Sequence, residues 1–215
     1  MLAKFTGWLL LGLIRLLTGA QARWWGCPPK AEQRIYFANH QSHLDLVMIW
    51  AALPEELRSI TRPIAARDYW ATTPFKRWIT TEVFNAIYVE RGGSAPGSTP
   101  PPPGSAEALL PLQPLIEALR SGDSIIIFPE GTRGHTGEPQ KFKSGLFTLA
   151  QMFPDAVLVP AWIDNVQRVM PKGEVVPVPI LCSVTFGAPL KLAEGEERRL
   201  FLDRAREAVI ALRYV

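Results

Sequence analysis

Apolar residues in this chain gather in two kinds of segment, short runs and longer stretches with helical spacing. The short runs predict strands, which lie at 34–38, 62–66, 83–89, 124–128, 157–163 and 180–186. The longer stretches predict helices at 44–53, 69–80, 105–120, 143–152 and 196–213. Strands that alternate with helices favour a mostly parallel sheet with helices on both faces. We therefore expect an α/β fold in which residues 31–215 form a single domain.

A low-complexity segment interrupts this alternation. Residues 92–104 consist of glycine, proline, serine, threonine and one alanine. A segment without large apolar side chains contributes nothing to a core. Because polar motifs that we expect to act together lie on both sides of it, we interpret it as a loop at the rim of the site and not as a domain boundary.

The N-terminal segment, residues 1–30, has a different pattern. Phe5 to Ala20 is apolar except for Arg15 and a few small or polar residues, and two adjacent tryptophans follow it. A full bilayer crossing takes about 20 apolar residues, whereas aromatic and cationic flanks are typical of a lipid interface. We expect a membrane-associating helix that lies in the membrane or at its interface. Two alternatives stay open: a signal peptide cleaved near Ala22, and a helix packed on the domain itself.

Charge is distributed unevenly along the chain. The formal net charge is +3, but residues 1–31 contain four basic residues and no acidic one. The remainder carries 19 basic and 20 acidic residues, so the folded domain lacks the overall basicity of a nucleic-acid-binding protein. We expect no nucleic-acid partner. Cys27 and Cys182 lie far apart in sequence, which predicts neither a disulfide framework nor a metal site.

The first candidate for chemistry lies where a predicted strand meets a predicted helix. Residues 39–45 read Asn-His-Gln-Ser-His-Leu-Asp. His40 and Asp45 are five positions apart, so they do not share a helix face. His40 must precede the helix, with Asp45 in its first turn, and Ser42 is then a plausible N-cap. In that geometry Asp45 orients the imidazole of a general base, although the same residues could simply cap a helix.

A second polar group follows the predicted strand 124–128. The sequence Phe-Pro-Glu-Gly-Thr-Arg at 128–133 predicts a buried strand that ends in a Pro-Gly loop. This loop presents Glu130, Thr132 and Arg133.

Three cations stand at the ends of elements or in loops. Arg91 follows the predicted strand 83–89, Arg133 ends the second polar group, and Lys143 precedes the helix predicted at 143–152. Arginine suits bidentate phosphate recognition, and lysine adds a point charge. Each cation alone would be interpreted as a solvated surface charge. Because all three follow or precede predicted elements, an anion-binding site is as good an interpretation as three surface charges.

Together these blocks resemble the glycerolipid acyltransferase family, whose best-known members are 1-acylglycerol-3-phosphate acyltransferases. The matching segments are 39–45, 88–91, 128–133 and 157–163, in the family's order over about 125 residues. The first and third blocks are highly specific together, and the other two are weak alone. Two positions depart from the family pattern. The second block ends Val-Glu-Arg where Ile-Asp-Arg is more usual, and Gly134 replaces a frequent serine, which leaves the acceptor less certain but keeps every charged group.

The resemblance implies an enzyme of phospholipid biosynthesis that moves a fatty acyl group from a thioester to a lysophospholipid hydroxyl. His40 would act as the base and Asp45 as its orienter. Arg91, Glu130, Gly131, Thr132, Arg133 and Lys143 would bind the substrate. Within that set the cations would hold the phosphate, while Glu130 would either bind glycerol hydroxyls or pair with a cation and shape the loop. A covalent route through Ser42 is the less favoured mechanism, because the thioester is already activated.

The resemblance also implies the setting. No cofactor is expected beyond the co-substrate, an acyl-CoA or acyl-ACP, so the partners would be membrane lipid and coenzyme A or acyl carrier protein. The active site would lie on the cytoplasmic face of the inner or plasma membrane. The acceptor could be 1-acyl-sn-glycerol-3-phosphate, giving phosphatidic acid, or alternatively a lyso-ornithine lipid or glycerol 3-phosphate. A non-catalytic lipid-binding membrane protein is the remaining alternative, and the oligomeric state does not follow.

Overall fold

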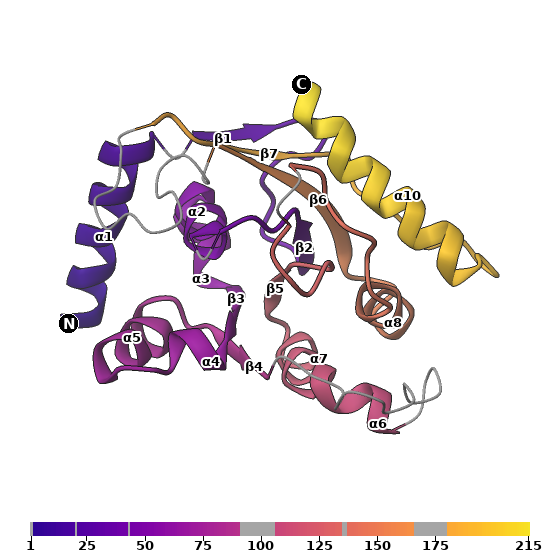
Figure 1. Ribbon diagram of the computed structural model, residues 1–215, viewed down its shortest axis with the longest axis horizontal. Coiled ribbons are helices and arrows are strands. Elements are labelled where there is room, and N and C mark those ends of the chain that lie inside the picture. Colours follow the sequence, from indigo (N-terminus) through magenta and orange to yellow (C-terminus); the bar gives the residue numbers. More distant parts are fainter. Residues whose placement is uncertain (1, 20, 43, 91–105, 135–136, 166–179) are drawn as a thin grey trace.

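The computed structural model describes residues 2–19, 21–42, 44–90, 106–134, 137–165 and 180–215. The predicted loop at 92–104 therefore lies outside the described residues. Seven strands form one sheet in the order β1-β7-β6-β2-β5-β3-β4 (Figure 1). Their bounds are Gln21–Trp24 (β1), Arg34–Ala38 (β2), Thr61–Ala66 (β3), Ile87–Val89 (β4), Ser124–Ile127 (β5), Val157–Asp164 (β6) and Ser183–Phe186 (β7).

The sheet is largely parallel, as the alternation of strands and helices predicted. Every neighbouring pair runs parallel except β6 and β7. Ile35 of β2 aligns with Ile125 of β5 on one side and with Leu158 of β6 on the other. All three side chains are buried at 3% exposure or less, as expected for central strands covered on both faces.

Helices cover both faces of the sheet, which confirms the predicted architecture (Figure 1). They are α1 (Leu2–Thr18), α2 (Asp45–Ala52), α3 (Glu55–Ser59), α4 (Arg67–Trp70), α5 (Pro74–Trp78), α6 (Ala106–Leu109), α7 (Gln113–Arg120), α8 (Gly145–Met152) and α10 (Arg198–Ala211). Alternate residues of β2 enter two separate cores. Ile35 and Phe37 pack with α7, α8 and α10, whereas Tyr36 and Ala38 pack with α2.

The helix predicted at 69–80 is wrong as a single element. The chain forms α4, then α5, then a π-helical turn at Ile79–Val83. The break has a local cause, because Thr73 caps a new helix by accepting from Lys76 N and Pro74 occupies its first turn. The strand predicted at 83–89 shrinks to Ile87–Val89, after a turn in which Asn85 has φ of 48°.

Two further elements differ from the sequence-based expectation. The helix predicted at 105–120 is interrupted by a 3₁₀ turn, Leu110–Leu112, with Pro111 inside it. Strand β1 was not predicted, because it is a short edge strand that borders only β7. Its four residues alternate between exposed and half-buried, and its apolar signal merges with that of the N-terminal segment.

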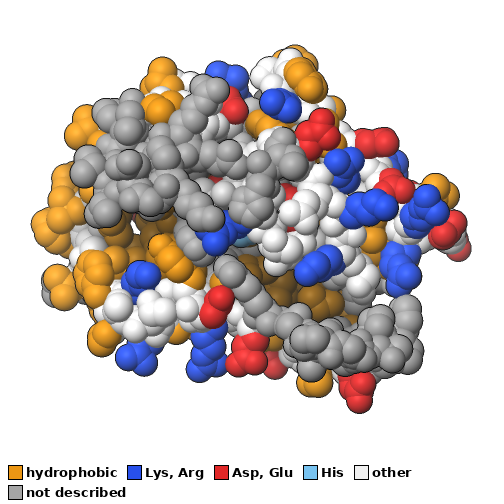
Figure 2. Space-filling model, viewed as in Figure 1, with side chains coloured by type: hydrophobic (Ala, Val, Ile, Leu, Met, Phe, Trp, Pro, Cys, Tyr) orange, Lys and Arg blue, Asp and Glu red, His pale blue; other side chains and the backbone are white. Residues whose placement is uncertain are grey.

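The N-terminal segment forms a helix that uses one face for packing. Leu11 and Ile14 of α1 contact the core on the α2 side of the sheet, so the alternative of a helix packed on the domain is realised on that face. The opposite face is apolar and exposed, and it includes Leu2, Phe5, Trp8, Leu9, Leu13 and Leu16 at 49–81% exposure. In Figure 2, hydrophobic side chains gather along the left edge of the molecule, where Figure 1 places α1. In the described part of the chain, no helix combines the length and apolarity that a bilayer crossing requires.

Candidate active site

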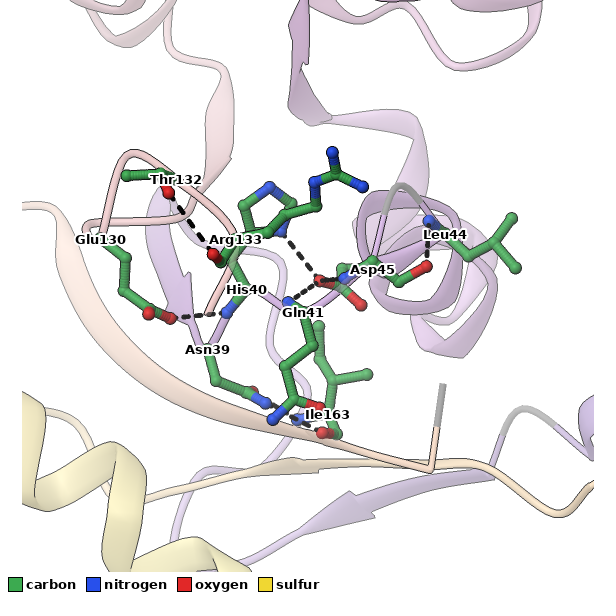
Figure 3. A network of polar contacts seen from close by, with 10 residues as sticks. Asn39, His40, Gln41, Leu44, Asp45, Glu130, Thr132, Arg133 and Ile163 are labelled. Carbon is green, nitrogen blue, oxygen red and sulfur yellow. Dashed lines mark hydrogen bonds and ion pairs between the residues drawn. The ribbon is translucent and has the colours of Figure 1, made fainter. Parts of the chain in front are cut away.

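The site lies where the carboxyl ends of neighbouring parallel strands meet, the usual binding edge of an open α/β sheet. β2 leads into His40, and β5 leads into the loop that carries Glu130 and Arg133 (Figure 3). A cavity of about 250 Å³ opens beside His40 and Lys143. Its apolar lining includes Ile64, Trp70, Leu115, Phe128, Leu146 and Leu149.

His40 and Asp45 form the contact that their spacing predicted. The distance from His40 Nδ1 to Asp45 Oδ2 is 2.8 Å. Asp45 is the first residue of α2 and is fully buried, whereas the His40 side chain keeps 16% of its surface exposed. Because Asp45 engages Nδ1, the other ring nitrogen, Nε2, remains for a substrate. The pair therefore has the arrangement of a general base with an orienting carboxylate.

The prediction that Ser42 caps the helix is wrong. The N-cap position of α2 is Leu44, and no side-chain capping bond forms there. Ser42 Oγ instead accepts from Leu44 N, two residues along, at 3.2 Å. The carboxylate of Asp45 organises the junction, since its Oδ2 accepts from Gln41 N at 2.6 Å and from Ser42 N at 2.7 Å. One oxygen thus fixes both the imidazole of His40 and the backbone that follows this residue.

Two residues that support His40 were not identified from the sequence. The ring of Phe128 stacks on the imidazole with centroids 4.4 Å apart and planes 19° apart. Beyond Ala38, where the pairing of β2 with β6 ends, the side chain of Asn39 forms the hydrogen bonds to the β6 backbone. Its Nδ2 donates to Ile163 O at 3.0 Å and its Oδ1 accepts from Ile163 N at 2.8 Å. An asparagine directly after a buried strand was the available signal, because its amide can mimic a peptide group.

Glu130 is buried at 2% exposure, and both its oxygens accept from backbone amides. Oε1 accepts from His40 N and Oε2 from Gln140 N, each at 2.7 Å. Burial raises the pKa of this carboxyl, while the two amide donors act in the opposite direction. Glu130 is not among the described residues that line the cavity. Two roles were predicted for Glu130, and this geometry favours shaping the loop over binding glycerol hydroxyls. The partners of Glu130 are backbone amides, whereas the second role also predicted an ion pair with a cation.

The predicted anion-binding residues divide into three groups. Gly131 and Lys143 line the cavity, and the pair is tightly fitted, since a Cβ on Gly131 would lie 2.6 Å from Lys143 Nζ. Arg133 and the exposed Thr132 belong to the same loop but, like Glu130, are not among the described residues that line the cavity (Figure 3). Arg91 lies outside the described residues. The structure thus brings Arg133 and Lys143 to the His40 end of the sheet.

We expect Gly131→Ala to impair the site through Lys143. Gly131 has φ of 68° and no room for a methyl group beside the lysine amine. Gly137→Ala is a matched control, because Gly137 has φ of 78° and its Cβ would meet nothing within 4 Å. Both substitutions cost about 1–2 kcal/mol of backbone strain. Urea unfolding should therefore change equally in the two variants, whereas the Km for an anionic acceptor should rise only in Gly131→Ala. Equal Km values in both variants would contradict the contact.

The cavity and the base together favour one class of chemistry. A histidine held by a carboxylate can take a proton from a hydroxyl, nearby cations can hold an anionic substrate, and an apolar cavity can hold a hydrocarbon chain. Within the described residues, no cluster of three or more His, Cys, Asp or Glu side chains could hold a metal ion.

Comparisons with known proteins agree with this chemistry. The model of the acyltransferase family matches residues 28–164. The chain is 30% identical over 125 residues to the 1-acyl-sn-glycerol-3-phosphate acyltransferase alpha of Mus musculus, covering 57% of this chain and 37% of the mouse protein. It is 27% identical over 146 residues to the chloroplastic 1-acyl-sn-glycerol-3-phosphate acyltransferase LPAT1 of Arabidopsis thaliana, covering 68% and 36% of the two chains. The matched region thus spans little more than a third of each relative.

The fold also has a counterpart among solved structures. The crystal structure of the 1-acyl-sn-glycerophosphate acyltransferase PlsC from Thermotoga maritima superposes with a TM-score of 0.67. The match covers 99% of this chain and 80% of the other, at 20% sequence identity. At that identity the likeness concerns the fold, and it extends beyond the segment that the family model matches.

Proposed function

Since this chain belongs to the acyltransferase family, we propose that it transfers a fatty acyl group from a thioester donor to the free hydroxyl of 1-acyl-sn-glycerol-3-phosphate, giving phosphatidic acid. The observation that carries the proposal is the 2.8 Å contact between His40 Nδ1 and Asp45 Oδ2, in which His40 also lines an apolar cavity. The activity in the names of the mouse and Arabidopsis relatives supports this choice of acceptor.

The proposed mechanism follows from the position of the base. His40 Nε2 takes the proton of the acceptor hydroxyl while that oxygen attacks the thioester carbonyl. Asp45 holds the ring and stabilises the imidazolium that forms. The tetrahedral intermediate then expels the donor thiolate, which recovers the proton from His40. The products are an ester and a free thiol, and no acyl-enzyme is required. The donor is an acyl-CoA or an acyl-ACP, and we expect no other cofactor.

We assign the acceptor phosphate to Arg133 and Lys143. From the sequence alone we add Arg91, which lies outside the described residues, as the third cation. Holding the phosphate fixes the hydroxyl near His40 and reduces the loss of orientational freedom in the transition state. Lys143 lines the cavity, and its backbone N donates to Pro129 O at 2.9 Å, next to Glu130. The cation and the base are therefore attached to the same loop.

The acceptor is tested with a panel of lipids. Membranes that contain the protein are supplied with a radiolabelled acyl donor and with lysophosphatidic acid, a lyso-ornithine lipid or glycerol 3-phosphate. We expect the label in phosphatidic acid. Label in another product would identify a different acceptor within the acyltransferase class. No labelled product from any acceptor would favour a non-catalytic lipid-binding protein and overturn the proposal.

We predict that Arg133→Ala raises the Km for lysophosphatidic acid about tenfold or more, the scale of a lost charge-assisted hydrogen bond of about 1.5–3 kcal/mol. The Km for the acyl donor should change little. Lys141→Ala is the matched control, because Lys141 is an exposed cation outside the loop that carries Arg133. Equal increases in both Km values for Arg133→Ala would argue against a phosphate role.

We further propose that residues 1–30 associate with the cytoplasmic face of the inner or plasma membrane through the exposed face of α1. Six large apolar side chains on that face are exposed, and two basic residues, Lys4 and Arg15, lie on the same helix. An apolar face with cationic residues fits an interfacial helix. This placement would give the site access to lipid acceptors and to water-soluble thioester donors.

The membrane assignment predicts a position-dependent effect of a new charge. Leu16→Asp, at 81% exposure on α1, should reduce sedimentation with anionic phospholipid vesicles. Leu200→Asp, at 60% exposure on α10, is the control and should bind like the wild type. Placing an aspartate in the apolar region of a bilayer costs about 2.5–3.5 kcal/mol. Equal binding by Leu16→Asp and the wild type would show that this face does not contact lipid.

A further inference from the structure

One polar side chain of the site is buried and does not line the described cavity, yet it contacts the backbone of the base. Glu130 accepts from His40 N through one oxygen and from Gln140 N through the other, each at 2.7 Å. Its burial, at 2% exposure, separates it from any substrate in the cavity.

The same loop holds the His40 peptide from its other side. Gly134 N donates to His40 O at 2.8 Å, so the loop 130–134 binds both the N–H and the C=O of the base. Arg133 lies between Glu130 and Gly134 in the sequence, and Figure 3 draws it next to His40. A shift of the loop would therefore move the arginine relative to the imidazole.

The second oxygen of Glu130 extends this connection to the lysine. Gln140 lies three residues before Lys143, and Lys143 N donates to Pro129 O at 2.9 Å. In addition, Arg206 of α10 donates from Nε to Pro139 O at 2.8 Å, which ties the same segment to the C-terminal helix. Glu130 thus bridges the base and the segment that leads to the second cation.

We propose that Glu130 is a positioning residue, which fixes the backbone of His40 relative to the segment that ends in Lys143. This inference rests on the proposed function, because it takes His40 as the base. The choice of a carboxylate follows from the geometry. Two N–H donors face the side chain, and an ionised carboxylate offers acceptors on both oxygens. A glutamine would present its amide N–H₂ group to one of them.

The kinetic test compares Glu130→Gln with Glu138→Gln in the chain of 215 residues. Glu138 lies in the same segment, its side chain is 65% exposed, and its ion pair with Arg206 is 3.9 Å long. We expect Glu130→Gln to lower kcat about 10²-fold, the scale of a 1 Å misplacement at a reacting centre. The Km for lysophosphatidic acid should stay close to the wild-type value. A raised Km with an unchanged kcat would overturn the inference and return Glu130 to a substrate-binding role.

Two measurements test the inference without substrate. First, diethyl pyrocarbonate should label His40 faster in Glu130→Gln than in the wild type, with Glu138→Gln unchanged. Mass spectrometry locates the label, and thermal melting confirms that the variants are folded. Second, site-resolved hydrogen exchange of the wild type should protect the amides of His40 and Gln140 like those of β2. Unchanged labelling in a folded Glu130→Gln, or fast exchange at both amides, would contradict the inference.

These readouts separate the inference from the function on which it rests. If the chain does not acylate any acceptor, the proposed function fails, while labelling and exchange still report on the contact. If the chain is active but kcat, labelling and exchange do not depend on Glu130, the inference alone fails. Should Glu130→Gln fail to fold, amide exchange of the wild type decides.

Discussion

His40→Ala should lower kcat for acyl transfer by about 10² to 10⁴, the usual contribution of a general base. The neighbouring carboxylate cannot take over as the base, because Asp45 is fully buried. The Km for lysophosphatidic acid should change little, since the proposed phosphate contacts with Arg133 and Lys143 remain. Initial rates at varied acceptor and donor concentrations measure both quantities.

The control for this variant is Gln41→Ala. Gln41 contributes its backbone N–H to the site, donating to Asp45 Oδ2 at 2.6 Å, and an alanine keeps that donor. This variant should therefore work near the wild-type rate. Wild-type activity in His40→Ala would contradict the proposed mechanism.

A covalent mechanism makes a different prediction for Ser42. If Ser42 were the nucleophile, Ser42→Ala would be as severe as His40→Ala, and an acylated serine would accumulate during turnover. In the structure, Ser42 Oγ accepts from Leu44 N at 3.2 Å, which is a local turn contact. We therefore expect Ser42→Ala to retain most of the activity.

The pair at the centre of the site could be predicted because its geometry is local. A strand that ends at Ala38 and a helix that begins at Asp45 leave few ways to arrange the residues between them. The spacing of His40 and Asp45 alone excluded a shared helix face, and this placed them across the junction. Ser42 was misassigned because the sequence does not show which side chain stabilises the turn.

The role of Glu130 could not be predicted in the same way. One of its partners, His40, is 90 residues away in sequence. Glu130 binds the backbone amides of His40 and Gln140, and every residue except proline has such an amide, so the residue types do not reveal the contacts. The reinforcement of His40 by Asn39 depends likewise on Ile163, 124 residues away. Sequence reasoning found the charged groups of the site, but tertiary contacts determine which of them face the cavity and which hold the loop.

The accuracy of the predicted strands and helices also depended on whether the sequence signal was local. The central strands β2, β5 and β6 were predicted within a residue or two, since fully buried strands leave continuous apolar runs. Errors gathered at 69–89, where Thr73 with Pro74 and the positive φ of Asn85 divide the chain into short elements. Trp70 and Val89 of this region line the cavity. The segment whose elements were predicted least accurately therefore forms part of the site.

Substitution of Asp45 should reduce both activity and stability, the combination that a buried orienting carboxylate predicts. Asp45→Asn keeps an oxygen that can accept, but it removes the negative charge that stabilises the imidazolium. The corresponding change in a Ser-His-Asp triad costs about 10⁴ in kcat. Because Asp45 acts through His40, we expect a large loss that does not exceed the loss in His40→Ala. Rates measured with lysophosphatidic acid and the acyl donor, at saturating concentrations of both, test this limit.

Asp45→Ala separates the structural part of the effect. It leaves Gln41 N and Ser42 N, two part-buried donors, without the acceptor that the fully buried Asp45 provides. An unsatisfied buried donor costs about 1–3 kcal/mol. Because these two donors are only part-buried, the free energy of unfolding should fall by about 1–3 kcal/mol in total. Asp203→Ala is the control, because that carboxylate is 57% exposed in an i,i+4 pair with Arg199, a contact worth about 0.3–0.5 kcal/mol. Equal urea midpoints for the two variants would mean that Asp45 does not hold the junction, and His40 would then need another orienting group.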